Sequence, residues 1–135
     1  MQYLIFKILL LFPFAGDTIP AQDEKIYSVS EVKIKPEPVK GNNDFYDKWS
    51  KKVVYPEEAS KNNIQGMVFI QFIVNTDGRI SDASVRAGIG YGCDEAALKG
   101  FNEVAKEAWK PAVKGEENVK VKMVVPFRFR ILERK

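Results

Sequence analysis

The last strand constrains the fold most, because its side chains alternate between apolar and polar over residues 119–131. One face is entirely apolar and carries Val119, Val121, Met123, Val125, Phe127, Phe129 and Ile131. The other face is mostly basic and carries Lys120, Lys122, Val124, Pro126, Arg128 and Arg130. A period of two residues predicts a half-buried strand. Because Pro126 has no N–H to donate to a neighbour, we expect this strand at an edge of the sheet.

The proline also predicts which side of the strand is open. Main-chain groups of even-numbered residues point to one side of a strand, and those of odd-numbered residues point to the other. The missing N–H of Pro126 is harmless only if the even side is the open one. We therefore expect a docking segment to form main-chain bonds with the even residues and to leave a gap at Pro126. These bonding residues are Lys120, Lys122, Val124, Arg128 and Arg130.

A long basic edge has two compatible interpretations. Outward cations protect an edge strand against aggregation with other sheets. The same edge can also bind an extended segment of a partner, for which the cations would favour an acidic peptide.

The N-terminal residues 1–21 predict an export signal. Lys7 precedes the apolar run Ile8–Phe12, which Pro13 and Gly16 bring to an end. This run is much shorter than the roughly 20 apolar residues that a membrane span needs. We therefore expect cleavage after Ala21 and no stable membrane span. The alternatives are a buried N-terminal helix and an uncleaved, tilted anchor.

Periodicity and turn residues predict the order of the remaining elements. Strands are expected at 26–34, 66–75, 79–88 and 119–131, and helices at 44–52, 56–62 and 95–108. Asp77-Gly78 is typical of a hairpin turn, and Asp94 is a candidate N-cap. The run Gly66–Asn75 is apolar on both faces, so we expect part of its second face to be covered. The fold class is α+β, with helices packed on one face of a small antiparallel sheet and a long C-terminal edge strand.

The composition excludes several kinds of chemistry. The chain has no histidine and one cysteine, Cys93, so an internal disulfide, the common zinc sites and the Cys–His or Ser–His–Asp systems are ruled out. We expect Cys93 to be buried, and we expect neither an enzyme nor a cofactor. With 21 Lys+Arg against 18 Asp+Glu, the net charge of +3 is too small to indicate nucleic-acid binding.

Several short segments lie in order along the second half of the chain: Tyr55–Ala59, Ile64–Gly66, Val68–Val74, Asn75–Ile80, Cys93–Leu98, Trp109–Ala112 and Val121–Phe129. Together they resemble the TonB C-terminal domain. The resemblance implies a periplasmic module that captures a short extended segment, the TonB box, of an outer-membrane transporter. In the family that segment adds as a strand beside the domain's last strand. Its contacts would then lie along Lys120–Arg130 and in the loop before Tyr55, which includes Lys52 and Val54.

The sequence also departs from a complete TonB energy transducer. Such a protein has an uncleaved membrane helix with a histidine for coupling to its motor, followed by a long proline-rich spacer. Here histidine is absent, only Pro36 and Pro38 stand between signal and domain, and Val54 replaces a glutamine often found before the Tyr-Pro pair. We therefore expect an exported, free-standing module, with a lead-in region at 22–52 and the domain at 53–135. A structural protein that homodimerises through the same edge is the alternative, and an uncleaved transport-energising anchor is a third, less favoured hypothesis.

Overall fold

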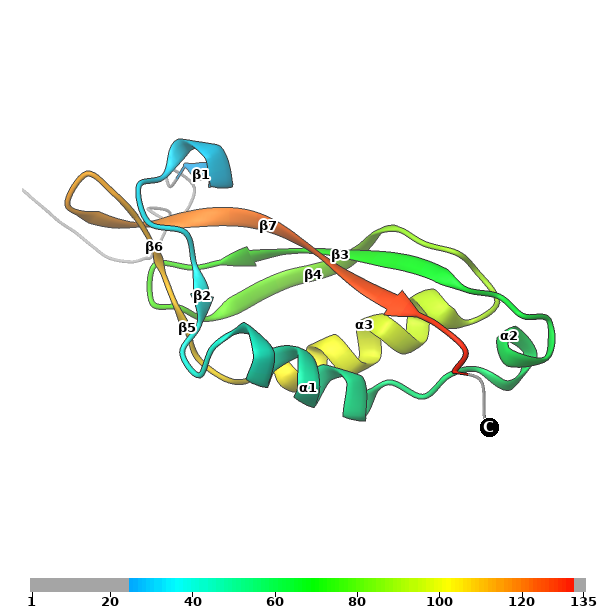
Figure 1. The fold of residues 1–135 in the computed structure, drawn as a ribbon. Helices are drawn as coiled ribbons and strands as arrows, with labels where there is room; N and C mark the ends of the chain where they lie inside the picture. Colours follow the sequence, from blue (N-terminus) through cyan, green and yellow to red (C-terminus); the bar gives the residue numbers. More distant parts are fainter. Residues whose placement is uncertain (1–24, 133–135) are drawn as a thin grey trace, which may run out of the picture.

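The computed structural model describes residues 25–132, in which α1 and α3 pack against one face of a curved sheet (Figure 1). The helices are α1 (Asn42–Lys52), α2 (Glu57–Lys61) and α3 (Cys93–Val104), with a 3-10 turn η3 (Val29–Glu31). The strands are β1 (Ile26–Ser28), β2 (Glu37–Pro38), β3 (Gly66–Val74), β4 (Ile80–Ala87), β5 (Trp109–Lys110), β6 (Ala112–Lys114) and β7 (Glu117–Phe129). The predicted export signal lies outside the described residues. Within the described part, no helix is both long enough and apolar enough to cross a membrane.

The main sheet has the strand order β1-β7-β3-β4, with β6 paired to the start of β7. Strands β3 and β7 pair antiparallel from Gly66 opposite Phe129 to Val74 opposite Val121. This register places the even residues of β3 and the odd residues of β7 on the same face, as the alternating sequence requires. The buried members of that face form much of the core: Val68, Ile70, Phe72, Val74, Val121, Val125 and Phe129.

Helix α1 approaches α3 closely through a glycine. A Cβ atom on Gly100 would lie 2.7 Å from the Cγ2 atom of Val53, so no larger residue fits without displacement. Trp49 of α1 is fully buried, and its Nε1–H donates a hydrogen bond of 3.0 Å to the carbonyl of Ala97. Its ring lies 5.3 Å from that of Phe101, so aromatic packing joins the two helices to each other.

The α+β prediction is confirmed, with several changes in detail. The sheet is mixed rather than wholly antiparallel, because β1 runs parallel to β7. The expected strand at 26–34 ends at Ser28, and the expected helix at 95–108 begins at Cys93 and ends at Val104. Asp94 is not the N-cap, which is Gly92. The Oδ1 atom of Asp94 instead accepts hydrogen bonds of 2.8 and 3.3 Å from the N–H groups of Ile89 and Gly90.

Candidate binding edge

From Val121 to Phe129, strand β7 has a neighbour along the whole of one side and along only part of the other. On one side β3 pairs with residues 121–129, whereas on the opposite side β1 pairs only with Lys120–Lys122. On that second side, no described strand pairs with the part of β7 that follows Lys122. We call this side of Met123–Phe129 the open edge.

The register identifies the main-chain groups that face the open edge. Pro126 lies opposite Phe69, and since proline has no N–H, this must be a non-hydrogen-bonded pair. The adjacent residues Val125 and Phe127 therefore bond to β3. The N–H and C=O groups of Val124 and Arg128, and the C=O of Pro126, point to the open edge.

A hydrogen bond in β1 leads to the same assignment. The N–H of Ser28 donates to a carboxylate oxygen of Glu31 over 2.8 Å, so it does not bond to β7. In a parallel pair, the main-chain groups of alternate residues face the neighbouring strand. Tyr27 is therefore the residue of β1 whose main chain bonds to β7, at Lys120 and Lys122. The even side of β7 therefore faces β1 and, further along, the open edge.

The predicted site residues fall into two groups. Val124, Pro126 and Arg128 lie on the open edge, and exposed Arg130 follows directly after β7. Lys120 and Lys122 do not lie on it, so the expectation that the whole last strand is an edge is wrong over these residues. The loose alternation after Ile26 gave a signal for a strand there, but alternation does not identify the strand with which it pairs.

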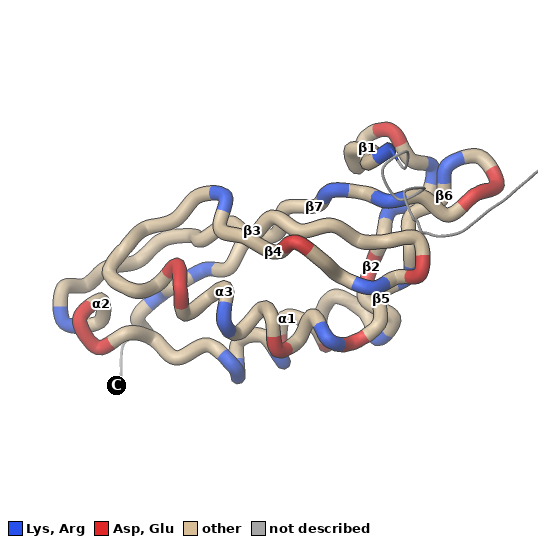
Figure 2. Tube along the Cα trace, turned by 180° about the vertical axis from the view of Figure 1, so that it is seen from behind, with Lys and Arg blue, Asp and Glu red and all other residues tan. Residues whose placement is uncertain are grey.

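The cations beside the open edge lack the carboxylate partners that many other lysines have. Lys48 lies 3.2 Å from Asp44 within α1, and its ion pair of 3.0 Å with Glu107 joins α1 to the segment after α3. In contrast, Lys122, Arg128 and Arg130 make no ion pair or side-chain hydrogen bond with any described residue. Figure 2 shows basic segments near both ends of β7, so the open edge carries a positive charge.

An apolar layer lies on the α1 side of β7. Phe127 packs on Trp49 with ring centroids 4.8 Å apart, and Tyr46 lies 5.6 Å from Trp49. Burial raises the pKa of the Tyr46 phenol, so this group stays neutral throughout the physiological range. Met123 and Phe127 are half-buried, and their remaining exposed surface is therefore apolar.

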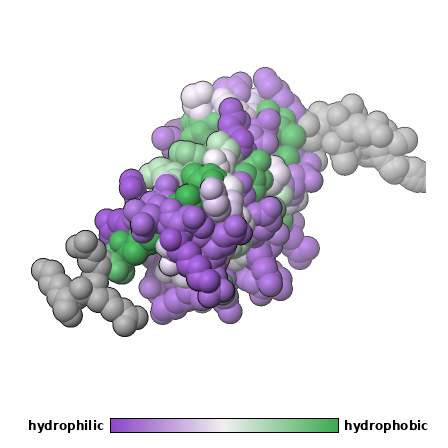
Figure 3. All heavy atoms as spheres, turned by 90° about the vertical axis from the view of Figure 1, so that its right-hand side faces the viewer, coloured by the Kyte–Doolittle hydropathy of each residue, from purple (hydrophilic) through white to green (hydrophobic). Residues whose placement is uncertain are grey.

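The loop before α2 lies at the far end of β7. The ring of Tyr55 is 5.3 Å from that of Phe129, and its hydroxyl donates a hydrogen bond to the carbonyl of Ile64. Val54 is 77% exposed, and Lys52 is the exposed last residue of α1. A shallow depression of about 700 Å³ lies here, lined by Tyr55, Glu57, Ser60, Lys61, Arg130, Ile131 and Leu132. Figure 3 shows apolar side chains grouped in the middle of this end of the molecule.

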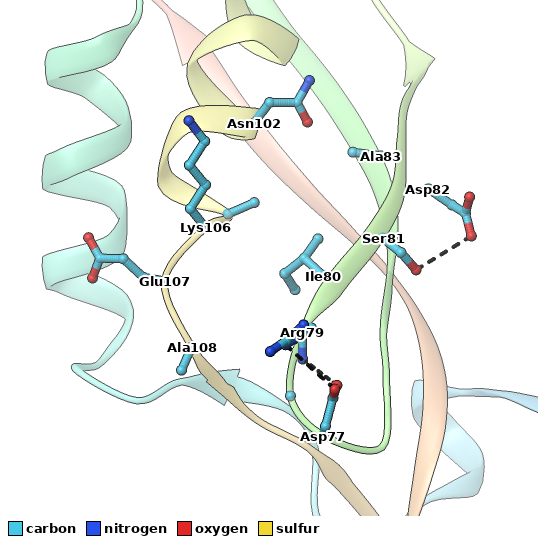
Figure 4. Close-up of a pocket in the computed structure, with 12 residues that line it drawn as sticks. Asp77, Arg79, Ile80, Ser81, Asp82, Ala83, Asn102, Lys106, Glu107 and Ala108 are labelled. Atoms are coloured by element: carbon cyan, nitrogen blue, oxygen red, sulfur yellow. Dashed lines mark hydrogen bonds and ion pairs between the residues drawn. The ribbon is translucent and has the colours of Figure 1, made fainter.

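The opposite edge of the sheet, β4, is less suited to a docking strand. Its pairing with β3 has two register shifts, and Asp82 within it has a positive φ of 55°. Such irregularities disrupt the regular row of main-chain groups. A depression of about 630 Å³ lies between β4 and the end of α3 (Figure 4). Its lining mixes the carboxylates Asp77 and Glu107 with Arg79 and Lys106, so it presents no charge of a single sign.

The described residues contain no group of three or more potential metal-ligating side chains. Cys93 is fully buried, as expected, and burial is the main cause that raises the pKa of its thiol. A buried neutral thiol is a poor nucleophile.

Comparisons with known proteins identify a family that matches much of the chain. The family described as Gram-negative bacterial TonB protein C-terminal matches residues 51–131. The fold resembles two NMR solution structures of the TonB C-terminal domain of Helicobacter pylori. The shorter form has a TM-score of 0.51 and 26% identity, covering 68% of this chain and 95% of that one. The longer form has a TM-score of 0.50 and 27% identity, covering 69% and 86%. Comparison with curated proteins gives no significant match.

Proposed function

The chain belongs to the TonB C-terminal domain family of Gram-negative bacteria, and we propose that it is a periplasmic module that binds an extended segment of an outer-membrane transporter. The family consists of non-enzymatic modules associated with TonB-dependent transport. The segment adds to the sheet as a further strand beside β7, so that binding supports transport across the outer membrane.

The open edge of β7 is the observation that supports this proposal. From Met123 to Phe129 the side of β7 away from β3 has no described neighbour, and Pro126 leaves one gap in the row of donors. Each main-chain hydrogen bond contributes about 1 kcal/mol net. The few bonds available at Val124, Pro126 and Arg128 therefore give only weak affinity, so side-chain contacts must supply the remainder and the selectivity.

Homodimerisation through the same edge is the alternative. A second copy could add its own β7 to the open edge, which would make the protein a structural or assembly component. Transporter binding and self-pairing compete for the same main-chain groups. Light scattering on the protein therefore separates them, because a tight dimer that blocks peptide binding contradicts the transporter proposal.

The direct test uses a proline at an open-edge position. Val124→Pro removes an N–H that faces the open edge, whereas Val124→Ala keeps the N–H and shortens the side chain. With a peptide from the N-terminal segment of a transporter plug, we expect Val124→Pro to lose at least about fivefold in affinity, which corresponds to about 1 kcal/mol. Val124→Ala should bind within about twofold of the unmodified protein.

NMR titration of the labelled protein locates the bound peptide. The amides of Val124 and Arg128 should shift most and become protected from hydrogen exchange. The proposal is wrong if the peptide instead shifts the amides of β4, or if Val124→Pro binds as well as Val124→Ala while both remain folded.

A further inference from the structure

We propose that the open edge selects segments whose side chains alternate in chemistry, apolar toward α1 and carboxylate toward the helix-free face. This inference rests on the proposed strand addition and specifies the partner's chemistry. The partner is thus an extended peptide in which acidic and apolar residues alternate over the length of the open edge.

The geometry of strand pairing gives each docked side chain a defined neighbour. Successive side chains of a strand point to opposite faces of the sheet, and directly opposed residues share a face. Docked residues opposite Met123, Val125 and Phe127 therefore lie on the α1 side. Docked residues opposite Val124, Pro126 and Arg128 lie on the helix-free face.

The α1 side favours apolar residues. Val125 is 8% exposed, and Met123 and Phe127 are half-buried. Trp49 lies against Phe127 at 4.8 Å, so a docked side chain here would approach rings and methyl groups. A charged group would lose hydration in this position without gaining a polar partner. An aliphatic side chain would instead bury part of the surface that remains exposed.

The helix-free face favours carboxylates. Arg128 lies on this face within the open edge, Lys122 lies on the same face one residue before the open edge begins, and Arg130 lies just after β7. No Asp or Glu occurs between Asn118 and Ile131. Since none of these three cations has a carboxylate partner among the described residues, an acidic side chain on a docked strand would form a new ion pair. Val124 and Pro126 lie between these cations, and short side chains of the docked strand would fit opposite them.

Strand β1 limits the length of the docked segment. It ends at Ser28, opposite Lys122, and occupies the side of β7 on which a longer segment would continue. The remaining length from Met123 to Phe129 is about 20 Å at about 3.3 Å per residue. A segment of about this length is sufficient, and additional residues toward β1 should add little.

The test compares three short peptides on the full chain by fluorescence anisotropy. The first alternates Asp and Val, the second has the same composition with its Asp residues in one block, and the third alternates Lys and Val. Exposed ion pairs are individually weak. We therefore expect the first peptide to bind about three- to tenfold more tightly than either of the others at low salt, with the difference decreasing as salt is added.

Matched charge reversals locate the effect at the edge. Arg128→Glu should reduce binding of the Asp-Val peptide and improve binding of the Lys-Val peptide. Lys99→Glu makes the same change in net charge on the exposed side of α3 and should leave the preference unchanged.

The outcomes separate this inference from the function on which it rests. If all three peptides bind equally and Val124→Pro weakens each of them, strand addition stands and the alternation rule is overturned. If Arg128→Glu and Lys99→Glu have equal effects, net charge rather than the edge determines the preference, and the rule is again overturned. If neither these peptides nor a transporter segment binds, both the proposed function and the inference fail.

Discussion

At the scale of single residues, Gly78 occupies a turn in which no side chain fits. It has a φ of +86°, and a Cβ atom added there would lie 2.0 Å from the carbonyl oxygen of Trp109. Trp109 N–H also donates to the Gly78 carbonyl over 3.1 Å, which holds the β3–β4 turn against β5. We expect Gly78→Ala to lower the free energy of unfolding by about 3 kcal/mol or more, measured by urea titration.

Gly90→Ala is the matched control for this prediction. Gly90 has a similar φ of +78°, but a Cβ atom added there would have no neighbour within 4 Å. Gly90→Ala should lower the free energy of unfolding only by the backbone cost of about 1 kcal/mol. Equal losses of stability in the two variants would show that contact with Trp109 is not the reason that position 78 requires a glycine.

Cys93 provides a test of burial through pH. Because burial raises the pKa of its thiol, the folded state holds this proton more tightly than the unfolded state does. Its contribution to stability is therefore fully present below the unfolded thiol's pKa of about 8.5 and is lost as pH rises through the higher folded pKa. We expect the free energy of unfolding to fall above about pH 8.5 in the unmodified protein, and to fall less in Cys93→Ala.

Alkylation provides the second measurement for Cys93. Iodoacetamide at pH 8 should modify the thiol slowly in the native protein and rapidly in urea. Rapid modification of the native protein would mean that Cys93 is accessible to solvent.

Residue types allow some of these roles to be predicted and conceal others. Proline's missing N–H is enough to predict that the even side of β7 faces away from β3, because this follows from covalent structure alone. Asp94 is favourable either as an N-cap or in the first helical turn, so its residue type does not distinguish the two. Its bonds to Ile89 and Gly90 depend on the path of the preceding loop, which local sequence does not determine.

At the scale of elements, β1 limits access to the open edge. Its main-chain contact with β7 is through Tyr27, and only Lys120–Lys122 are covered. Tyr27→Pro removes the N–H of residue 27, whereas Tyr27→Ala keeps this N–H and removes only the ring, over which the ammonium groups of Lys25 and Lys114 lie. We expect Tyr27→Pro to release β1 and to let a longer docked segment extend to Lys120, increasing its affinity about threefold or more.

The effect of peptide length tests this assignment. A peptide confined to the open edge should bind Tyr27→Pro and Tyr27→Ala with similar affinity, because it does not reach β1. A longer peptide that gains nothing in Tyr27→Pro would show that β1 does not compete for the edge.

The longer elements can be predicted from the sequence and the shortest cannot. Strands β3 and β7 and helices α1 and α3 each span enough residues for a period of two or 3.6 to appear. Strands β2, β5 and β6 have two or three residues each, so they contain no complete pattern. Local sequence consequently indicates only a helix end at Trp109-Lys110, although these residues pair with Glu37-Pro38.

At the scale of the whole molecule, the charge of β7 argues against self-pairing through the open edge. An antiparallel pair of two β7 strands that uses only the open edges is centred at Pro126, so Arg128 of one copy lies opposite Val124 and diagonal to Lys122 of the other. Like charges within reach of each other on one face destabilise a strand pair, and the stretch from Asn118 to Ile131 has no carboxylate to compensate.

We therefore expect the protein to be monomeric at about 100 μM in low salt, as measured by light scattering with size exclusion. Added salt should screen the repulsion and increase any weak self-association, whereas it should weaken binding of an acidic segment. Arg128→Glu would place a carboxylate diagonal to Lys122 of a second copy, so this variant should self-associate more than the unmodified protein, and Lys99→Glu should not. A stable dimer at low salt that dissociates in Arg128→Glu would contradict this argument and favour the assembly role.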